Sequence, residues 1–224
     1  MKAAAFLSIL SALATLFLLA SSANANLALP HIEIHSQLAH EQVDIKITGD
    51  QGEVTGTFKY IKTVEDYYDL TLYLPVYAVK GTPVKDFTPD IHLGDQKLEV
   101  VFVKKEWEQE RDIRDFGNLP QIEGQRVYWF MIPHVPQQPE QKEFTLKIRY
   151  TQKLSNGKFI YTPLIPKQEE GKDYGSITVS ADRPLTLLDA DKHSFEKSED
   201  KFVVDPSDKR AIVVQVAKTP AKLP

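Results

Sequence analysis

Apolar and polar residues alternate along many short stretches of this chain of 224 residues. In the stretch 144–150 every second residue is apolar, and threonine, lysine and arginine stand between them. Successive side chains of a β-strand point to opposite faces, so this pattern predicts a strand with one buried face. Comparable alternating or β-rich stretches are 43–47, 54–60, 70–74, 98–102, 176–180, 185–188, 201–204 and 212–216.

The pair Asn156-Gly157 predicts a tight hairpin between the stretch 144–154 and the apolar run 159–161. Asn-Gly is the preferred pair for a two-residue turn, because both central residues need a positive φ. Such a turn places Ser155 opposite Lys158 and Leu154 opposite Phe159. We therefore expect the two arms to form neighbouring antiparallel strands.

Glycine, aspartate and proline stand at the ends of the other stretches. Turns are predicted at 49–52 and at Gly94-Asp95, and Pro75 is expected to end the strand before it, since proline lacks a ladder donor. The spacing predicts about ten to thirteen short strands with little helix. The expected fold class is all-β, an antiparallel two-sheet β-sandwich.

We expect one β-sandwich domain over 26–217, with a flexible tail at 218–224. Residues 104–115 are highly charged and free of glycine and proline, but their apolar residues form no helical stripe. We interpret the segment near 104–120 as a charged surface excursion. Because the polar segment 163–174 interrupts the strands, a division into two domains stays open.

The first 25 residues have the features of a secretory signal peptide. A basic start at Met1-Lys2 precedes the uncharged stretch 3–20, and Ala23-Asn24-Ala25 supplies a small-x-small processing site. We expect cleavage before Asn26 and export to a periplasmic or extracellular location. The alternative is an uncleaved membrane anchor, because the apolar stretch is nearly long enough to span a bilayer.

Composition narrows the function classes. The formal net charge of −4 disfavours nucleic acid as a partner. The chain contains no cysteine, so a catalytic thiol and a thiolate metal site are excluded, and an exported protein must be stabilised by its core.

The sequence contains none of the common catalytic or nucleotide-binding motifs, such as Gly-x-Ser-x-Gly, a Walker loop or His-Glu-x-x-His. We therefore assign no catalytic residue, no cofactor and no metal site. Two constellations stay open. His31, Glu33 and His35 alternate on one face of a possible strand, although their spacing of nearly 7 Å suits a solvent-facing strand better than one metal ion. Scattered carboxylate pairs, such as Glu108 with Glu110, keep a secreted hydrolase as an alternative.

The run 127–132 differs from the other stretches, because it is apolar on both faces. It is either a central strand covered on both sides, or a strand with one face toward a ligand or partner. Tyrosine and tryptophan suit both sugar stacking and protein interfaces. The candidate recognition surface comprises Tyr128, Trp129, Phe130 and Trp107, and burial of Trp129 would distinguish the two interpretations.

Three stretches resemble VIT-type domains and related secreted bacterial β-sandwiches: 52–58, 68–76 with its Leu-Pro step, and 148–154 with its Tyr-x-x-x-Leu hairpin. The resemblance implies a β-sandwich fold and an interaction role. The von Willebrand A domain that often accompanies such domains is not expected here, because the Asp-x-Ser-x-Ser signature is missing. No functional residue carries over.

The sequence thus predicts an exported, non-catalytic binding or envelope-associated module of unknown ligand. Its expected partner is another envelope protein or a polysaccharide, with no membrane span in the mature chain. The alternatives are a carbohydrate-active or other secreted hydrolase, and a structural or assembly partner in the cell envelope.

Overall fold

The computed structural model describes residues 36–62, 70–103, 124–136, 140–163, 173–188, 195–198, 201–206 and 211–217. The predicted signal peptide, the charged excursion near 104–120 and the tail lie outside these ranges, and the single domain over 26–217 stays a prediction. Nearly all described elements are strands, apart from the short 3-10 helix η1 at Val84–Asp86.

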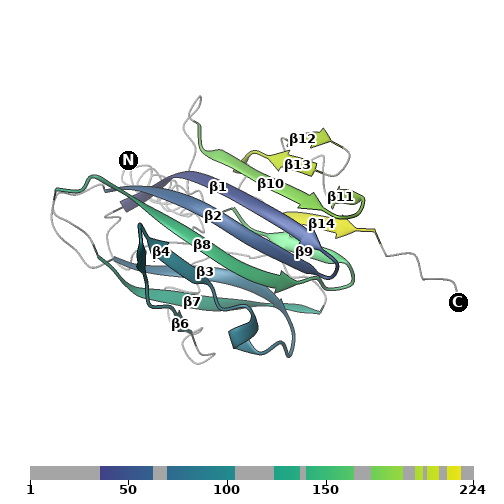
Figure 1. Ribbon diagram of the computed structural model, residues 1–224, viewed down its shortest axis with the longest axis horizontal. Coiled ribbons are helices and arrows are strands. Elements are labelled where there is room, and N and C mark those ends of the chain that lie inside the picture. Colours follow the sequence, from purple (N-terminus) through teal and green to yellow (C-terminus); the bar gives the residue numbers. More distant parts are fainter. Residues whose placement is uncertain are drawn as a thin grey trace, which may run out of the picture.

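Eight strands form the larger sheet, in the order β12-β13-β10-β1-β2-β8-β4-β5. Their bounds are β1 Ser36–Thr48, β2 Gln51–Lys62, β4 Asp90–Leu93, β5 Gln96–Lys97, β8 Glu143–Lys153, β10 Gly175–Ala181, β12 Phe195–Ser198 and β13 Lys201–Val204. The long strands β1, β2 and β8 run side by side at the centre (Figure 1).

Two sheets of three strands each lie behind the larger sheet in the view of Figure 1. One has the order β3-β7-β6, with β3 at Leu70–Val79, β7 at Gln125–Val135 and β6 at Val101–Phe102. The other has the order β11-β14-β9, with β11 at Leu185–Leu188, β14 at Ile212–Val216 and β9 at Lys158–Tyr161. The apolar core lies between these layers.

The alternation in the sequence becomes the two faces of the larger sheet. In β8 the even-numbered residues from Phe144 to Gln152 are buried, and the odd-numbered residues are exposed or half-buried. In β2, Val54, Phe58 and Tyr60 are buried on the same side as Gly56. Burying one apolar face of each strand is the main stabilising contribution to such a sheet. The predicted all-β sandwich is confirmed.

One pair of strands departs from the expected antiparallel arrangement. β1 and β10 pair in parallel, with Val43 opposite Ile177 and Ile45 opposite Val179. Parallel neighbours need a connection that crosses to the other end of the sheet. The chain meets this need after β8, because it passes through β9 in the opposite layer before it returns as β10.

The turn at Asn156 and Gly157 forms as predicted, with φ values of 52° and 74°. Ser155 and Lys158 are bridged, as expected, but this bridge is isolated. Beyond it β8 pairs with β2 in the larger sheet, whereas β9 pairs with β14 in a smaller one. The expected ladder with Leu154 opposite Phe159 is therefore wrong, because the two arms diverge into different layers.

Side-chain amides bind the edge of β9 that no described strand of its own sheet pairs with. The Gln125 Nε2 donates to the Lys158 carbonyl at 3.2 Å, and the Gln152 Nε2 donates to the Ile160 carbonyl at 3.3 Å. Both glutamines are buried and come from the other two sheets. Because buried backbone carbonyls need donors, these amides satisfy β9 where the three sheets meet.

Two predicted strand boundaries are wrong. β3 continues through Pro75 to Val79, because β3 is an edge strand and a missing N–H on its open side removes no ladder bond. The stretch 98–102 is not one strand, since only Val101 and Phe102 pair with β7, while the amide of Leu98 donates to the Ile91 carbonyl.

Within the described residues, no helix is both long enough and apolar enough to span a bilayer.

Candidate functional site

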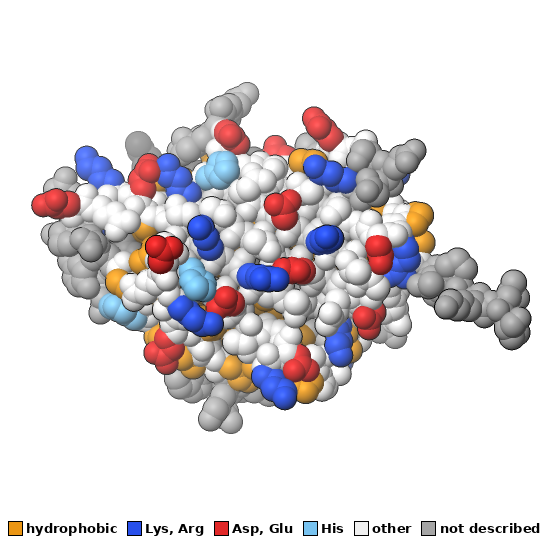
Figure 2. Space-filling view, viewed as in Figure 1, with side chains coloured by type: hydrophobic (Ala, Val, Ile, Leu, Met, Phe, Trp, Pro, Cys, Tyr) orange, Lys and Arg blue, Asp and Glu red, His pale blue; other side chains and the backbone are white. Residues whose placement is uncertain are grey.

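The outer face of the larger sheet carries two neighbouring rows of polar residues that cross five strands, from β10 to β4. The first row is Thr178, Asp44, Thr55, Arg149 and Asp90, and the second is Ser176, Gln42, Thr57, Lys147 and His92. Figure 2 shows this face with basic and acidic side chains interspersed. The face is therefore polar and of mixed charge.

Two adjoining depressions indent this face where β4 lies beside β8. One has a volume of about 430 Å³ and is lined by Thr55, Asp90, His92, Gly94, Asp95, Lys147, Ile148 and Arg149. The other has a volume of about 500 Å³ and is lined by Leu93, Gly94, Gln96, Pro136, Gln141, Glu143, Phe144, Thr145 and Lys147. They share Gly94 and Lys147, and we call them together the β4–β8 groove. Small-ligand sites have similar volumes.

The turn Gly94-Asp95 shapes this groove. Gly94 adopts a positive φ of 60°, which glycine accepts without steric cost, and the turn connects β4 to β5. β4 pairs with β8, so that His92 lies directly opposite Lys147. The hairpin thereby adds a short raised edge beside the long strand β8.

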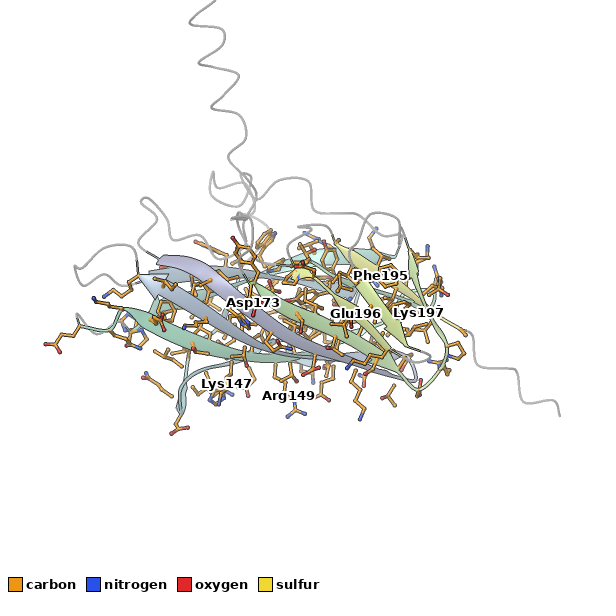
Figure 3. All side chains as sticks on the ribbon, turned by 90° about the horizontal axis from the view of Figure 1, so that it is seen from above. Lys147, Arg149, Asp173, Phe195, Glu196 and Lys197 are labelled. Atoms are coloured by element: carbon orange, nitrogen blue, oxygen red, sulfur yellow. The ribbon has the colours of Figure 1, made fainter. Side chains whose placement is uncertain are left out.

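Ion pairs neutralise several charges of the groove. The Asp90 carboxylate accepts from the Lys97 Nζ at 2.5 Å and lies 3.3 Å from the His92 Nε2. The hydrogen bond from Lys97 is the main cause that lowers the pKa of Asp90 below its ordinary value. The Arg149 guanidinium lies 2.6 Å from the Glu53 carboxylate. In Figure 3, Lys147 and Arg149 point away from the sheet on its outer side.

The pKa of Asp90 does not match the requirement for a general acid in glycoside hydrolysis. A general acid for that reaction needs a raised pKa, so that it holds a proton at neutral pH. The pKa of Asp90 is shifted the opposite way, and Asp90 and Asp95 belong to the same short hairpin. The groove therefore offers charged and hydrogen-bonding contacts, and its Asp90 lacks the raised pKa that a general acid needs.

The predicted recognition residues have different positions in the structure. Phe130 is fully buried and Trp129 is 6% exposed, so these two belong to the core and not to a recognition surface. Because consecutive residues of a strand point to opposite faces, both faces of β7 are covered at this point. Tyr128 is half-buried, with its ring 4.9 Å from that of Phe87, and its role in recognition stays a prediction. Trp107 lies outside the described residues.

A second polar cluster lies inside the core, where the sheets meet. Glu41 of β1 is fully buried, and the Tyr161 hydroxyl of β9 donates to its Oε1 at 2.6 Å. Burial raises the pKa values of Tyr60, Tyr150 and Tyr161, and the nearby Glu41 raises them further. Glu41 shares the inward parity of Val43, Ile45 and Ile47, which is the one signal in the sequence that could have revealed it.

Metal binding finds no support in the described part of the chain, where no group of three histidine, aspartate or glutamate side chains is placed to hold an ion. His31, Glu33 and His35 lie outside that part. The sequence has no signal that places His92 and Asp95 beside Lys147, because the pairing of β4 with β8 brings them together.

Comparisons with known proteins concern the fold. No family model matches the sequence, and a search of curated proteins finds no match. A candidate nutrient-binding protein from Legionella pneumophila has a similar fold, with a TM-score of 0.51 and 10% identity over 86% of this chain and 70% of that chain.

Two enzymes have lower scores. Yeast LTA4 hydrolase gives a TM-score of 0.43 and 8% identity over 81% of this chain and 28% of its own. Legionella pneumophila aminopeptidase A gives 0.40 and 12% identity over 83% of this chain and 22% of its own. This chain therefore spans less than a third of either enzyme.

Proposed function

We propose that this protein is an exported, non-catalytic binding module, and that the β4–β8 groove holds a polar ligand or a partner segment. The observation that carries the proposal is the position of Lys147. It is exposed, it lines both depressions, and in the described structure it has no ion pair or hydrogen bond. A cation without a partner in a concave polar site can interact with a ligand at no cost to an internal pair.

The surroundings of Lys147 support binding over catalysis. Hydroxyl, amide and imidazole groups line the groove beside it, from Thr55, Thr145, Gln96, Gln141 and His92. Such groups provide directional hydrogen bonds for a ligand. The lowered pKa of Asp90 argues against this residue as the general acid of a hydrolase.

A thermal-shift screen tests this function. The purified chain is heated with oligosaccharides, cell-wall fragments and short peptides, together with the variants K147E and K153E. A ligand that binds only the folded state raises the melting temperature by mass action. We expect at least one compound to stabilise wild type and K153E but not K147E, because Lys153 is an exposed lysine of β8 outside the groove lining. The proposal fails if no compound stabilises the chain, or if K147E responds like wild type.

Export forms a separate part of the proposal. The motif Ala23-Asn24-Ala25 and the uncharged stretch before it support a mature chain that starts at Asn26. Mass spectrometry of the chain recovered from the envelope fraction of a bacterial host tests this. A mass that retains residues 1–25 would favour the membrane anchor instead.

Export to the envelope would bring the module into contact with polysaccharides and other envelope proteins, which are the two partner classes that the sequence predicts. The resemblance to VIT-type domains supports an interaction role. A structural or assembly role would instead require a stable complex, which chemical crosslinking in the envelope would recover.

A further inference from the structure

The charges of the β4–β8 groove do not neutralise one another completely. Asp90 pairs with Lys97, Arg149 pairs with Glu53, and Glu143 pairs with Lys59 at 2.7 Å. Lys147 and Asp95 have no ion pair or hydrogen bond within the described part of the chain. One ammonium group and one carboxylate therefore stay available in the same depression.

The fold holds these two groups in different ways. Lys147 projects from the outer face of β8, near the centre of the larger sheet, where both depressions meet. Asp95 lies in the turn between β4 and β5, which closes the side of the depression. One charge comes from a strand and the other from a separate turn, and no neighbour in the described part of the chain pairs with either of them.

We propose that the groove binds a zwitterionic ligand, namely an amino acid or a short peptide with free termini. The ligand carboxylate pairs with the Lys147 ammonium, and the ligand ammonium pairs with the Asp95 carboxylate. This inference rests on the proposed binding function and specifies its ligand class. Binding of this kind leaves the three internal ion pairs intact.

The second depression fits the rest of a peptide. Gln96, Gln141 and Thr145 provide donors and acceptors for backbone amides, and the half-buried Leu93 and Pro136 offer apolar contact for a side chain. A stacked sugar ring needs an exposed aromatic face. Phe144 is the aromatic residue in the lining of the groove, and it is buried. The lining therefore favours a peptide over a polysaccharide.

Titrations followed by amide NMR shifts test the ligand class. The probes are trialanine, N-acetyl-trialanine and trialanine amide, with chitotriose as a sugar probe, at low ionic strength where exposed charges are least screened. We expect trialanine to shift the amide signals of Gly94, Asp95 and Lys147. Removing either terminal charge should weaken binding by about two- to fivefold, as for an exposed ion pair.

Charge variants assign each terminus to its partner. K147Q should bind trialanine and trialanine amide equally, and D95N should bind trialanine and its N-acetyl form equally. K153Q and D44N are matched controls, because they remove the same charges from exposed positions outside the groove lining. These controls should keep both preferences.

The outcomes separate this inference from the proposed function. If chitotriose shifts the groove signals and trialanine does not, the binding site stands and the zwitterionic ligand is wrong. If trialanine binds but K147Q and D95N keep both preferences, the assignment of the charges is wrong. If no probe shifts the groove signals, the zwitterionic ligand is overturned, and the thermal-shift screen decides independently whether the groove binds another class.

Discussion

Replacing Tyr161 with phenylalanine tests the polar cluster inside the core. The change removes the hydroxyl that donates to the buried Glu41 at 2.6 Å and leaves the aromatic ring in place. That distance lies in the range of hydrogen bonds to an ionised carboxylate. Such bonds contribute about 1.5–3 kcal/mol, whereas bonds between neutral groups contribute about 0.5–1.5 kcal/mol.

Tyr77 offers a matched control for this substitution. It is also buried, but its hydroxyl shares a 3.3 Å hydrogen bond with the neutral Thr162 hydroxyl. We expect Y161F to lower the free energy of unfolding by about 1.5–3 kcal/mol and Y77F by about 0.5–1.5 kcal/mol. Both losses leave a folded protein if its stability is in the usual range of about 5–15 kcal/mol.

Urea unfolding followed by circular dichroism measures both variants against wild type, with the slope of the transition checked for two-state behaviour. We expect Y161F to be clearly less stable than Y77F. If Y161F loses no more stability than Y77F, the Glu41 carboxylate does not depend on the Tyr161 hydroxyl, and the cluster has been misinterpreted.

Three further predictions concern the core and the groove. Burial raises the pKa of Tyr77 to about 12 and also raises those of Tyr60, Tyr150 and Tyr161, so the neutral forms stabilise the fold. This stability is fully present below the unfolded-state pKa of about 10 and is lost above it, at about 1.4 kcal/mol per pH unit for each tyrosine. Urea unfolding between pH 9 and pH 11, a range about the pKa of free tyrosine, should show a steep loss of the free energy of unfolding. A free energy of unfolding that stays constant over this range would contradict the burial of the hydroxyls. G52A should cost about 1–3 kcal/mol by overpacking, because a Cβ there would lie 2.4 Å from the Phe159 ring, and an equal effect of T57A on the exposed face of β2 would refute this. K147Q should change the melting temperature of the unliganded protein by no more than K153Q does, and a large loss would reveal a structural role for Lys147.

The alternation of apolar residues was sufficient to predict the strands and their buried faces. Phe144, Leu146 and Ile148 are buried as expected, because a strand has a period of two and one side must face the core. The turn at Asn156-Gly157 was predictable for a local reason as well, since few residue pairs accept two positive φ values.

The non-local features of the fold left no comparable pattern in the sequence. The sequence gives no indication that β8 and β9 separate after one bridge, because either partner would satisfy the same apolar pattern. Trp129 could have faced a ligand or the core, and the folded structure buries it, together with Phe130 on the opposite face of β7. The resemblance to VIT-type domains and the predicted signal peptide remain predictions.

The candidate site depends most on tertiary structure. His92 and Asp95 belong to one hairpin, far along the chain from Lys147, and each of the three is an ordinary residue of a polar strand face or turn. Local chemistry specifies strands, turns and the inward side of each strand, since these depend on neighbouring residues. Which charges pair, and which two stay available in one groove, depends on the register between β4 and β8, and that register exists only in the folded sheet.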